Sequence, residues 1–403
     1  MSFLKPLLPL LLAIALVAVE YMISEPSCVV SGRVGESERH SDDLKVIMVA
    51  DLLLPGSDAG YTDTFFRDPF KSKFFRKSLE KFRPDMLLVL GDVSARGWEL
   101  TESKWRTVIQ QFYKLLGPFM GLPLHIALGD RDIGECSELD EQFASQIVSS
   151  LPSLGLSGCS SFEMGNVSFV SLNSVALLCG TNDLRFRVEK VIERESIVFR
   201  NRAKETEILG KPSFRQERSN NFQWRDNKME SGSGPVLLLH FPLHRKKRSI
   251  LEVADVNQGI CKHTDGDLRR IKDSLTKLFI KLFQARIDKF KDMGPYALQK
   301  TFPVNETEYV LQALKPRIVF SAHSQKFCDH THSDGTREVT VPAMTWTSGQ
   351  KPGLVFVNFG HNKEVSVSHC SFVSERHVIL LYLCVFMLSI SVVFIARCLN
   401  LVK

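Results

Sequence analysis

The chain has 403 residues, of which 44% are hydrophobic and 24% are charged, and this composition is typical of a globular protein. It excludes a wholly disordered chain and a transporter with many membrane spans. The 51 Lys and Arg residues exceed the 45 Asp and Glu residues by a net charge of only +6, which is too small for the chain to be a nucleic-acid-binding protein.

Apolar runs near both ends of the chain predict contact with a membrane. The first run, within residues 1–24, follows Lys5 and fits either a signal peptide or a signal anchor. The second run, residues 378–396, holds no charge and as a helix would measure roughly 28 Å, enough for a transmembrane helix; a buried helix is the alternative. Basic residues at the outer flanks predict that the body between the two runs lies on the lumenal side.

Two features of that body agree with a lumenal position. Asn166 and Asn305 each begin an Asn-X-Ser/Thr sequence, the acceptor for N-glycosylation. Seven of the nine cysteines lie between the apolar runs, where disulfides can form, and an odd number leaves at least one of them unpaired. No Cys-X-X-Cys pair occurs, so the sequence gives no support for a thiolate zinc site.

Short apolar runs predict buried strands along the body of the chain. These runs are residues 46–50, 86–90, 124–128, 167–172, 236–239, 318–321 and 354–358. Because the runs are continuous, they indicate sheets covered on both faces. Between the first two, residues 65–83 carry Phe and Leu at helical spacing, which predicts a covering helix, with a ligand groove as the alternative. The order strand, helix, strand predicts an α/β fold.

Two stretches depart from this pattern within the domain predicted for residues 42–370. Residues 185–234 are dense in charge and end in Ser-Gly-Ser-Gly, so we expect a partly helical, partly disordered insertion. Residues 266–293 have the pattern of a basic amphipathic helix. Such a helix lies on a membrane surface or packs against its own domain.

Five candidate metal ligands stand at the ends of predicted strands. They are Asp51, Asp92, Asp130, His240 and His323. Loops beyond strand ends carry the sites of open α/β sheets, and carboxylates together with imidazoles suit Zn, Fe or Mn. Any one of these residues alone would be a helix cap, a turn residue or a structural histidine. Their common position at strand ends predicts a metal centre.

The order of these residues resembles that of the calcineurin-like metallophosphoesterases. The motifs of that family are DxH, GDxxxxG, GNHD, a single His after a strand, and GHxH. The counterparts here are Asp51-Leu52-Leu53, Gly91-Asp92 with Gly97, Gly129-Asp130-Arg131-Asp132, His240, and Ala322-His323-Ser324-Gln325. The resemblance covers about residues 45–360. It implies a four-layer α/β/β/α sandwich, here with terminal hydrophobic helices.

A closer similarity connects the chain to the membrane-bound branch of the family that remodels GPI anchors. It rests on residues 170–177, 239–245 and 341–346 and on the apolar run near the C-terminus. It implies a phosphodiesterase that removes ethanolamine phosphate from a GPI glycolipid or GPI-anchored protein, in the endoplasmic reticulum or the Golgi. The implied cofactor is Mn, with Zn or Fe as alternatives.

The resemblance also assigns roles in two-metal hydrolysis, in which two cations clamp the phosphate. Asp92 matches the carboxylate that bridges the metals, and it would complete one site with Asp130, His240 and His323. The other site would need Asp51 and two histidines, but Leu53 and Gln325 stand in place of those histidines. We therefore expect one strong metal site and a second that is weak or empty.

The catalytic candidates are Arg131 and Asp132. Arg131 replaces the His of GNHD; its guanidinium can bind a phosphate but stays protonated and cannot act as a general acid. The sequence His330-Thr331-His332 fits a surface hairpin, with replacement of a lost ligand as the alternative. Two functions follow: a membrane-anchored metallophosphoesterase, or a catalytically impaired descendant that binds a GPI glycan or a cargo protein.

Overall fold

The computed structural model describes residues 17, 21, 25–31, 43–117, 121–136, 139–151, 154–155, 157–165, 167–179, 183–208, 234–245, 301–346, 351–360 and 364–401. Most of the predicted signal segment 1–24 lies outside the described residues. So do Asn166, residues 209–233 of the charged insertion and the whole amphipathic segment 266–293.

The first sheet has six strands in the order β1-β12-β11-β2-β3-β4. Their bounds are Ser27–Ser31 (β1), Val365–Ser371 (β12), Gly353–Phe359 (β11), Leu44–Val49 (β2), Met86–Leu90 (β3) and Leu124–Ala127 (β4). Strands β2, β3 and β4 run parallel, with Val46 opposite Met86 and Leu87 opposite Leu124. The carboxyl ends of these three strands therefore share one edge.

The second sheet has the order β5-β6-β7-β8-β10-β9. Its strands are Ser160–Met164 (β5), Val167–Ser171 (β6), Val236–Leu238 (β7), Ile318–Ser321 (β8), Arg337–Thr340 (β10) and Cys328–Thr331 (β9). Strands β6, β7, β8 and β10 are parallel, while β5 and β9 pair antiparallel with their neighbours. All seven apolar runs that predict strands lie in strands, with ends shifted by at most two residues.

Alternating side chains of the strands build two kinds of core. Val46 and Met48 of β2 pack between the sheets, together with Phe169 and Phe320 of the second sheet. Ile47, the neighbour of both, belongs instead to the core under the helices. Both faces of each sheet are thus apolar and covered, as the continuous runs predict.

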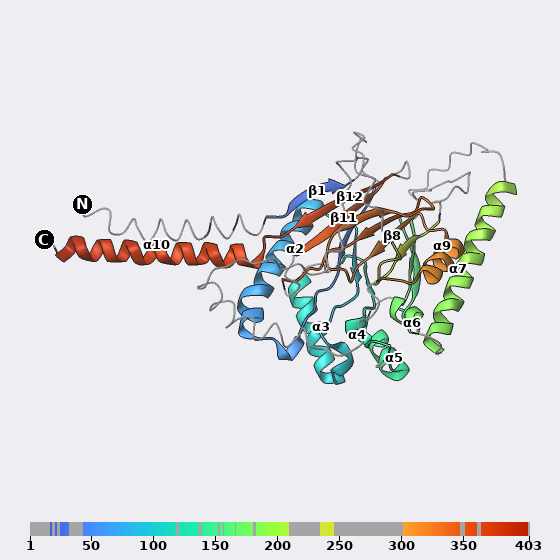
Figure 1. The fold of residues 1–403 in the computed structure, drawn as a ribbon, viewed down its shortest axis with the longest axis horizontal. Helices are drawn as coiled ribbons and strands as arrows, with labels where there is room; N and C mark the ends of the chain where they lie inside the picture. The colour runs from blue at the N-terminus through green and yellow to red at the C-terminus, as the bar shows by residue number, and fades with distance from the viewer. Residues whose placement is uncertain are drawn as a thin grey trace.

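Helices cover the outer faces of the two sheets (Figure 1). On the side of the first sheet they are α2 (Asp68–Phe82) and α3 (Glu102–Leu116); on the side of the second they are α6 (Ser174–Leu178), α7 (Asp183–Ile208) and α9 (Val304–Leu314). The short helices α4 (Asp130–Ile133) and α5 (Glu141–Ser150) follow β4. The predicted four-layer α/β/β/α sandwich is confirmed.

Helix α7 accounts for the helical part of the segment expected as an insertion. Leu184, Val188 and Ile192 are buried in the core at helical spacing. Its first half is therefore part of the second helical layer. Charged residues such as Lys190, Glu193 and Arg200 are exposed on its outer face.

The Phe-rich segment forms α2, and its inner face confirms the predicted covering helix. Phe70, Phe74 and Phe75 are buried in the core. The helix ends at Arg83, which adopts a left-handed φ of 46°. A cavity of about 560 Å³ lies between α2 and the C-terminal helix, lined by Phe65, Phe66, Pro69, Phe70, Lys73, Ile379, Tyr382, Leu383 and Phe386.

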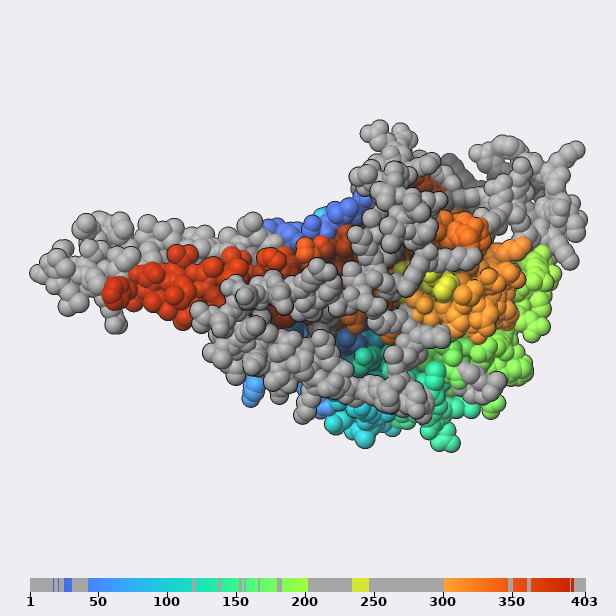
Figure 2. Space-filling view, viewed as in Figure 1, coloured from blue at the N-terminus to red at the C-terminus, as the bar shows by residue number. Residues whose placement is uncertain are grey.

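The C-terminal helix α10 (Glu375–Leu401) projects from the body as a rod (Figures 1 and 2). Arg67 joins its first turn to the start of α2, with Nε 2.7 Å from Glu375 Oε1. Large apolar side chains of α10 are exposed, including Leu380, Phe386, Met387, Leu388 and Phe394. Within the part of the chain that the structure describes, no helix has both the length and the apolar character needed to cross a bilayer. The transmembrane role of residues 378–396 stays a prediction.

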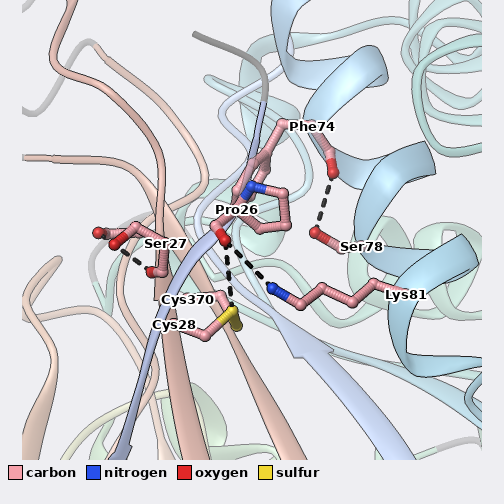
Figure 3. The surroundings of a disulfide bond; sticks show 8 residues. Pro26, Ser27, Cys28, Phe74, Ser78, Lys81 and Cys370 are labelled. Atoms are coloured by element: carbon pink, nitrogen blue, oxygen red, sulfur yellow. Dashed lines mark hydrogen bonds between the residues drawn. A yellow bond between two sulfur atoms is a disulfide. The ribbon is translucent and has the colours of Figure 1, made fainter. Parts of the chain in front are cut away.

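Disulfides connect distant parts of the chain. Cys28 of β1 is bonded to Cys370 of β12, 342 residues away in sequence (Figure 3). Cys136 is bonded to Cys179. Cys159 is buried and unpaired, and burial raises the pKa of its thiol to about 11. The first bond closes a very long loop, which restricts the unfolded chain most strongly.

His125 on β4 generates a prediction about stability and pH. It is 1% exposed, its ring lies 4.9 Å from that of Phe162, and neither ring nitrogen has a hydrogen-bond partner among the described residues. Burial lowers its pKa from 6.5 to about 4. Between these values the unfolded chain binds the additional proton, so stability falls as the pH drops from 6.5 to 4.

We therefore expect His125→Leu to reduce the loss of stability over that pH range. The measurement is chemical unfolding of the full chain and of the variant at pH 7, 5.5 and 4. The difference in unfolding free energy between the two proteins should change by about 3 kcal/mol from pH 7 to pH 4. A difference that is independent of pH would contradict the assignment.

Candidate metal centre

The ends of four parallel strands bring four of the five predicted metal ligands together. Asp92 follows β3, Asp130 follows β4, His240 follows β7 and His323 follows β8. One ligand atom from each lies within 4.8 Å of all the others. Two of these strands belong to each sheet, so the group lies where corresponding edges of both sheets meet.

Hydrogen bonds and close charge contacts hold the group. His240 Nε2 lies 2.9 Å from Asp130 Oδ1 and 3.4 Å from Asp92 Oδ1. His323 Nδ1 lies 3.1 Å from Asp130 Oδ1. The other ring nitrogen of His240, Nδ1, donates to the Leu90 carbonyl at 2.8 Å, which fixes the ring and presents Nε2 to the centre.

The backbone of the ligand loops adopts left-handed conformations. The φ angles of Asp51, Asp92 and His323 are 49°, 54° and 59°. The φ angles of Leu53 and Gln325, which stand where the resembling motifs have histidines, are 49° and 60°. Each such non-glycine conformation costs about 1–3 kcal/mol. The left-handed backbone therefore occurs in these loops both at candidate ligands and at Leu53 and Gln325.

Two glycines allow the loops to approach closely. Gly91 has a φ of 86°, and a Cβ atom there would lie 2.5 Å from His240 Nδ1. A Cβ on Gly129 would lie 2.1 Å from Asp92 Oδ1. A side chain at either position would push a ligand away, so these glycines belong to the centre as much as the ligands do.

Asp132, a predicted catalytic residue, lies beneath the centre and is fully buried. Its carboxylate accepts hydrogen bonds from the amides of Ser94 at 2.9 Å and Gly129 at 3.0 Å. Burial raises its pKa to about 6. These contacts tie the Asp92 loop to the Asp130 loop, so Asp132 acts as a positioning residue.

Arg131, the other predicted catalytic residue, lies at the rim. Its backbone amide donates to Asp92 Oδ1 at 2.9 Å. Its guanidinium Nε is 3.9 Å from Asp130 Oδ2, and its side chain is 36% exposed. The guanidinium can therefore meet a phosphate from solvent while its own backbone supports the Asp92 carboxylate.

Asp51 is the predicted ligand that lies outside the group of four. It is 1% exposed, and neither of its carboxylate oxygens has a hydrogen-bond partner among the described residues. Burial raises its pKa, while the imidazoles of His240 and His323 act in the opposite direction. A buried carboxylate without a partner is costly, and a bound cation would remove that cost.

Burial and the neighbouring charges shift the pKa values of three members of the group. Burial and the neighbouring Asp130 carboxylate hold the pKa of Asp92 well above its usual range. Burial also acts to raise the pKa of Asp130, but His323 and His240 outweigh it and hold that pKa well below its usual range. For His240 the effect of burial is outweighed by Asp92 and Asp130, so its pKa is raised well above 6.5. Closely packed oxygen and nitrogen donors of this kind fit a divalent metal.

The second half of the expected two-metal centre lacks imidazoles. Leu53 has no ligand atom, and Gln325 offers only an amide. His332 does not replace them, because its Nε2 bonds to Glu338 Oε2 at 3.0 Å within the β9–β10 hairpin. The donors of the described residues therefore fit one metal well and a second metal poorly.

The comparison with known proteins agrees with this site. No family model matches the chain. Metallophosphoesterase 1 of Danio rerio is 24% identical over 353 residues, which span 86% of this chain and 80% of the relative. These relatives support the resemblance of the chain to the calcineurin-like metallophosphoesterases. The Metallophosphoesterase 1 homolog of Drosophila melanogaster is 22% identical over 344 residues, spanning 85% of this chain and 79% of the relative.

Solved structures give a weaker match to this chain. A dimetal phosphatase from Danio rerio aligns with a TM-score of 0.39 and 13% identity, covering 78% of this chain and 95% of that one. The purple acid phosphatase PPD1 from yellow lupin aligns with the same TM-score of 0.39 and 12% identity, covering 84% of this chain and 55% of that one.

The sequence does not indicate which groups hold the candidate metal ligands in place. The Leu90 carbonyl orients His240, and the Ser174 hydroxyl accepts the His240 amide at 3.2 Å. A backbone carbonyl leaves no signal in a sequence. Ser174 lies in the stretch 170–177 that carries part of the family resemblance, and this was the one available clue.

We expect the full chain to bind about one Mn²⁺ or Co²⁺ per molecule, with stabilisation against heat. His323→Gln removes one donor from the group. Loss of an outer contact lowers metal affinity by roughly 10- to 100-fold, and loss of a direct ligand should lower the affinity for Mn²⁺ or Co²⁺ by more than that. Isothermal titration and thermal unfolding with and without metal measure this. His330→Gln on β9 is the matched control and should bind as the unchanged chain does. Equal weakening by both variants would contradict the assignment.

Proposed function

We propose that the chain is a metal-dependent phosphoesterase that hydrolyses a phosphodiester at a single strong metal site. The observation that carries this proposal is the convergence of Asp92, Asp130, His240 and His323 within 4.8 Å, with the Arg131 guanidinium at the rim. Cationic and metal-binding groups placed together in this way suit a phosphate.

The residues of the chain have separable roles in such a reaction. When bound, a divalent metal supplies Lewis-acid chemistry that polarises a phosphoryl oxygen. Arg131 binds and orients the phosphate through paired hydrogen bonds, and Asp132 keeps the two ligand loops in register. Arg131 cannot protonate the leaving group, so we expect slower turnover than a histidine at this position would give.

The proposed substrate is ethanolamine phosphate on a GPI glycolipid or GPI-anchored protein, with Mn as the metal. Support comes from the resemblance in residues 170–177, 239–245 and 341–346 to the branch that remodels GPI anchors. Support from the curated relatives is limited to the name Metallophosphoesterase 1, which states a phosphoester as substrate and no more.

The proposed location is the lumenal side of the endoplasmic reticulum or Golgi membrane. Disulfides persist in oxidising compartments, and the bonds Cys28–Cys370 and Cys136–Cys179 support such a compartment. Asn305 lies exposed in the first turn of α9, where a glycan would meet solvent. Attachment through residues 378–396 is supported by the exposed apolar side chains of α10.

The replaced ligands favour a second candidate, a non-catalytic protein that binds a GPI glycan or a cargo protein. Leu53 and Gln325 keep the left-handed backbone of the ligand loops without the ligands themselves. A domain of this kind would retain one metal and the phosphate-binding Arg131. It would hold a phosphodiester without cleaving it.

The first test is hydrolysis of a chromogenic phosphodiester by the full chain with Mn²⁺. Arg131→Gln should raise KM because a charged contact to the phosphate is lost, and Asp92→Ala should abolish turnover because a ligand of the metal is lost. Turnover no higher than that of Asp92→Ala, together with retained binding of the diester, would leave only the non-catalytic candidate.

The second test restores the histidines of the family motifs. The triple variant Leu53→His, Arg131→His and Gln325→His places imidazoles in loops that already have the matching backbone conformation. We expect its metal content to rise from about one to about two per chain and its diester turnover to increase at least tenfold. Elemental analysis and kinetics on the same sample measure both, and the single variant Arg131→His is the control for proton donation alone. An unchanged metal content would show that the second site is lost for another reason.

A further inference from the structure

A buried carboxylate on β10 gathers hydrogen bonds from several parts of the second sheet. Glu338 is 0% exposed. Its donors are the Leu243 amide at 3.0 Å, the Ser321 hydroxyl at 2.7 Å, the Arg245 guanidinium at 3.2 Å and His332 Nε2 at 3.0 Å. A single carboxylate thus joins three segments of the chain: residues 243–245, Ser321 and His332.

Two of these donors lie close in sequence to the histidine ligands, one in the loop after His240 and one at the last residue of β8. Leu243 lies three residues after His240, and Ser321 lies two residues before His323. The amide of Ala322 also donates to the His240 carbonyl at 2.9 Å, so the two loops touch directly. Glu338 therefore fixes the position of one loop relative to the other from behind.

Arg245 and His332 compensate the negative charge of Glu338. The side chain of Arg245 is only 11% exposed, and it also donates to Thr340 Oγ1. The side chain of His332 is 7% exposed. Hydrogen bonds and charges from His332 and Arg245 outweigh burial and lower the pKa of Glu338 to about 2. The carboxylate is therefore ionised at every pH near neutrality.

Removing one member of such a group leaves the others buried without partners. Glutamine at position 338 would keep the shape of the side chain. It would also present an amide NH₂ group to donors that need an acceptor. Leu243 and Ser321 donate to Oε1 of Glu338, whereas Arg245 and His332 donate to Oε2. Either orientation of the amide therefore turns its NH₂ group toward two donors and disturbs the loops that they hold.

We propose that Glu338 is a positioning residue of the metal centre, which holds His240 and His323 at the mutual spacing that a divalent metal requires. The proposal rests on the metal site of the proposed function. Its mechanism is geometric: a fixed anion ties together the loops on which two of the four donors stand. Outer contacts of this kind typically change metal affinity by roughly 10- to 100-fold.

The test compares two variants of the full chain on the same strand. Glu338→Gln should weaken Co²⁺ binding by about 10- to 100-fold and change the visible absorption of bound Co²⁺. The matched control is Arg337→Gln, which breaks the neighbouring ion pair between Arg337 Nη2 and Asp329 Oδ2 at 2.7 Å. The control variant should bind Co²⁺ as the unchanged chain does.

A second measurement works without metal. Diethylpyrocarbonate modification, mapped by mass spectrometry, reports whether His240 is accessible. His240 is 0% exposed, so it should resist the reagent in the unchanged chain and in Arg337→Gln, and react in Glu338→Gln. If the unchanged chain binds no Co²⁺, the proposed function fails, while protection of His240 still decides whether Glu338 positions the loop.

A milder variant covers the case in which Glu338→Gln does not fold. Ser321→Ala removes one donor and leaves every charge in place, and we expect it to weaken Co²⁺ binding severalfold with little change in thermal stability. The proposal is overturned if the folded Glu338→Gln variant keeps full Co²⁺ affinity and a protected His240. Equal losses in Glu338→Gln and Arg337→Gln would also overturn it, because they would indicate a general effect on the hairpin.

Discussion

The centre depends on the cost of burying like charges close together. Asp51, Asp92 and Asp130 all lie at 4% exposure or less. Burial and the neighbouring carboxylates raise the pKa values of Asp51 and Asp92, whereas His323 and His240 hold the pKa of Asp130 low. Two imidazoles offset part of this cost, and Asp51 has no offsetting hydrogen bond among the described residues. The left-handed loops and the glycines beneath them bring these groups into contact, and burial in the sandwich keeps water from separating them. A cation is the simplest partner for the charge that remains.

The candidate centre has two halves that differ in their donors. One half has carboxylates and imidazoles that suit a metal, and the other half lacks imidazoles. Leu53 and Gln325 have φ angles of 49° and 60°, in the left-handed region that favours glycine. Arg131 follows the same pattern, because its amide still supports Asp92 while its side chain has lost the ability to exchange a proton. The backbone geometry of these loops and the chemistry of their side chains are therefore separate properties of the site.

The sequence predicted the buried parts of the fold and the ligands at the strand ends, because both depend on local patterns. Continuous apolar runs locate β3 and β8 to the residue, and a polar residue after such a run marks the edge of a sheet. Strands β5 and β9 gave no such signal, because their side chains alternate in burial or are mostly polar. Glu338 could not be recognised either: its role depends on Leu243, Ser321 and His332, which meet only after the chain has folded. The placement of Asp51 beside the other ligands, and not among them, is likewise a property of three-dimensional packing.

The bond between Cys28 and Cys370 has a mechanical consequence. It makes residues 28–370 a covalent ring from which the two ends of the chain leave at a single point. Tension applied between the ends would pass through the sulfur atoms and bypass both sheets. Strand β1 could not be peeled from β12 by such a force, and the ligand loops would remain unloaded while the tails were pulled.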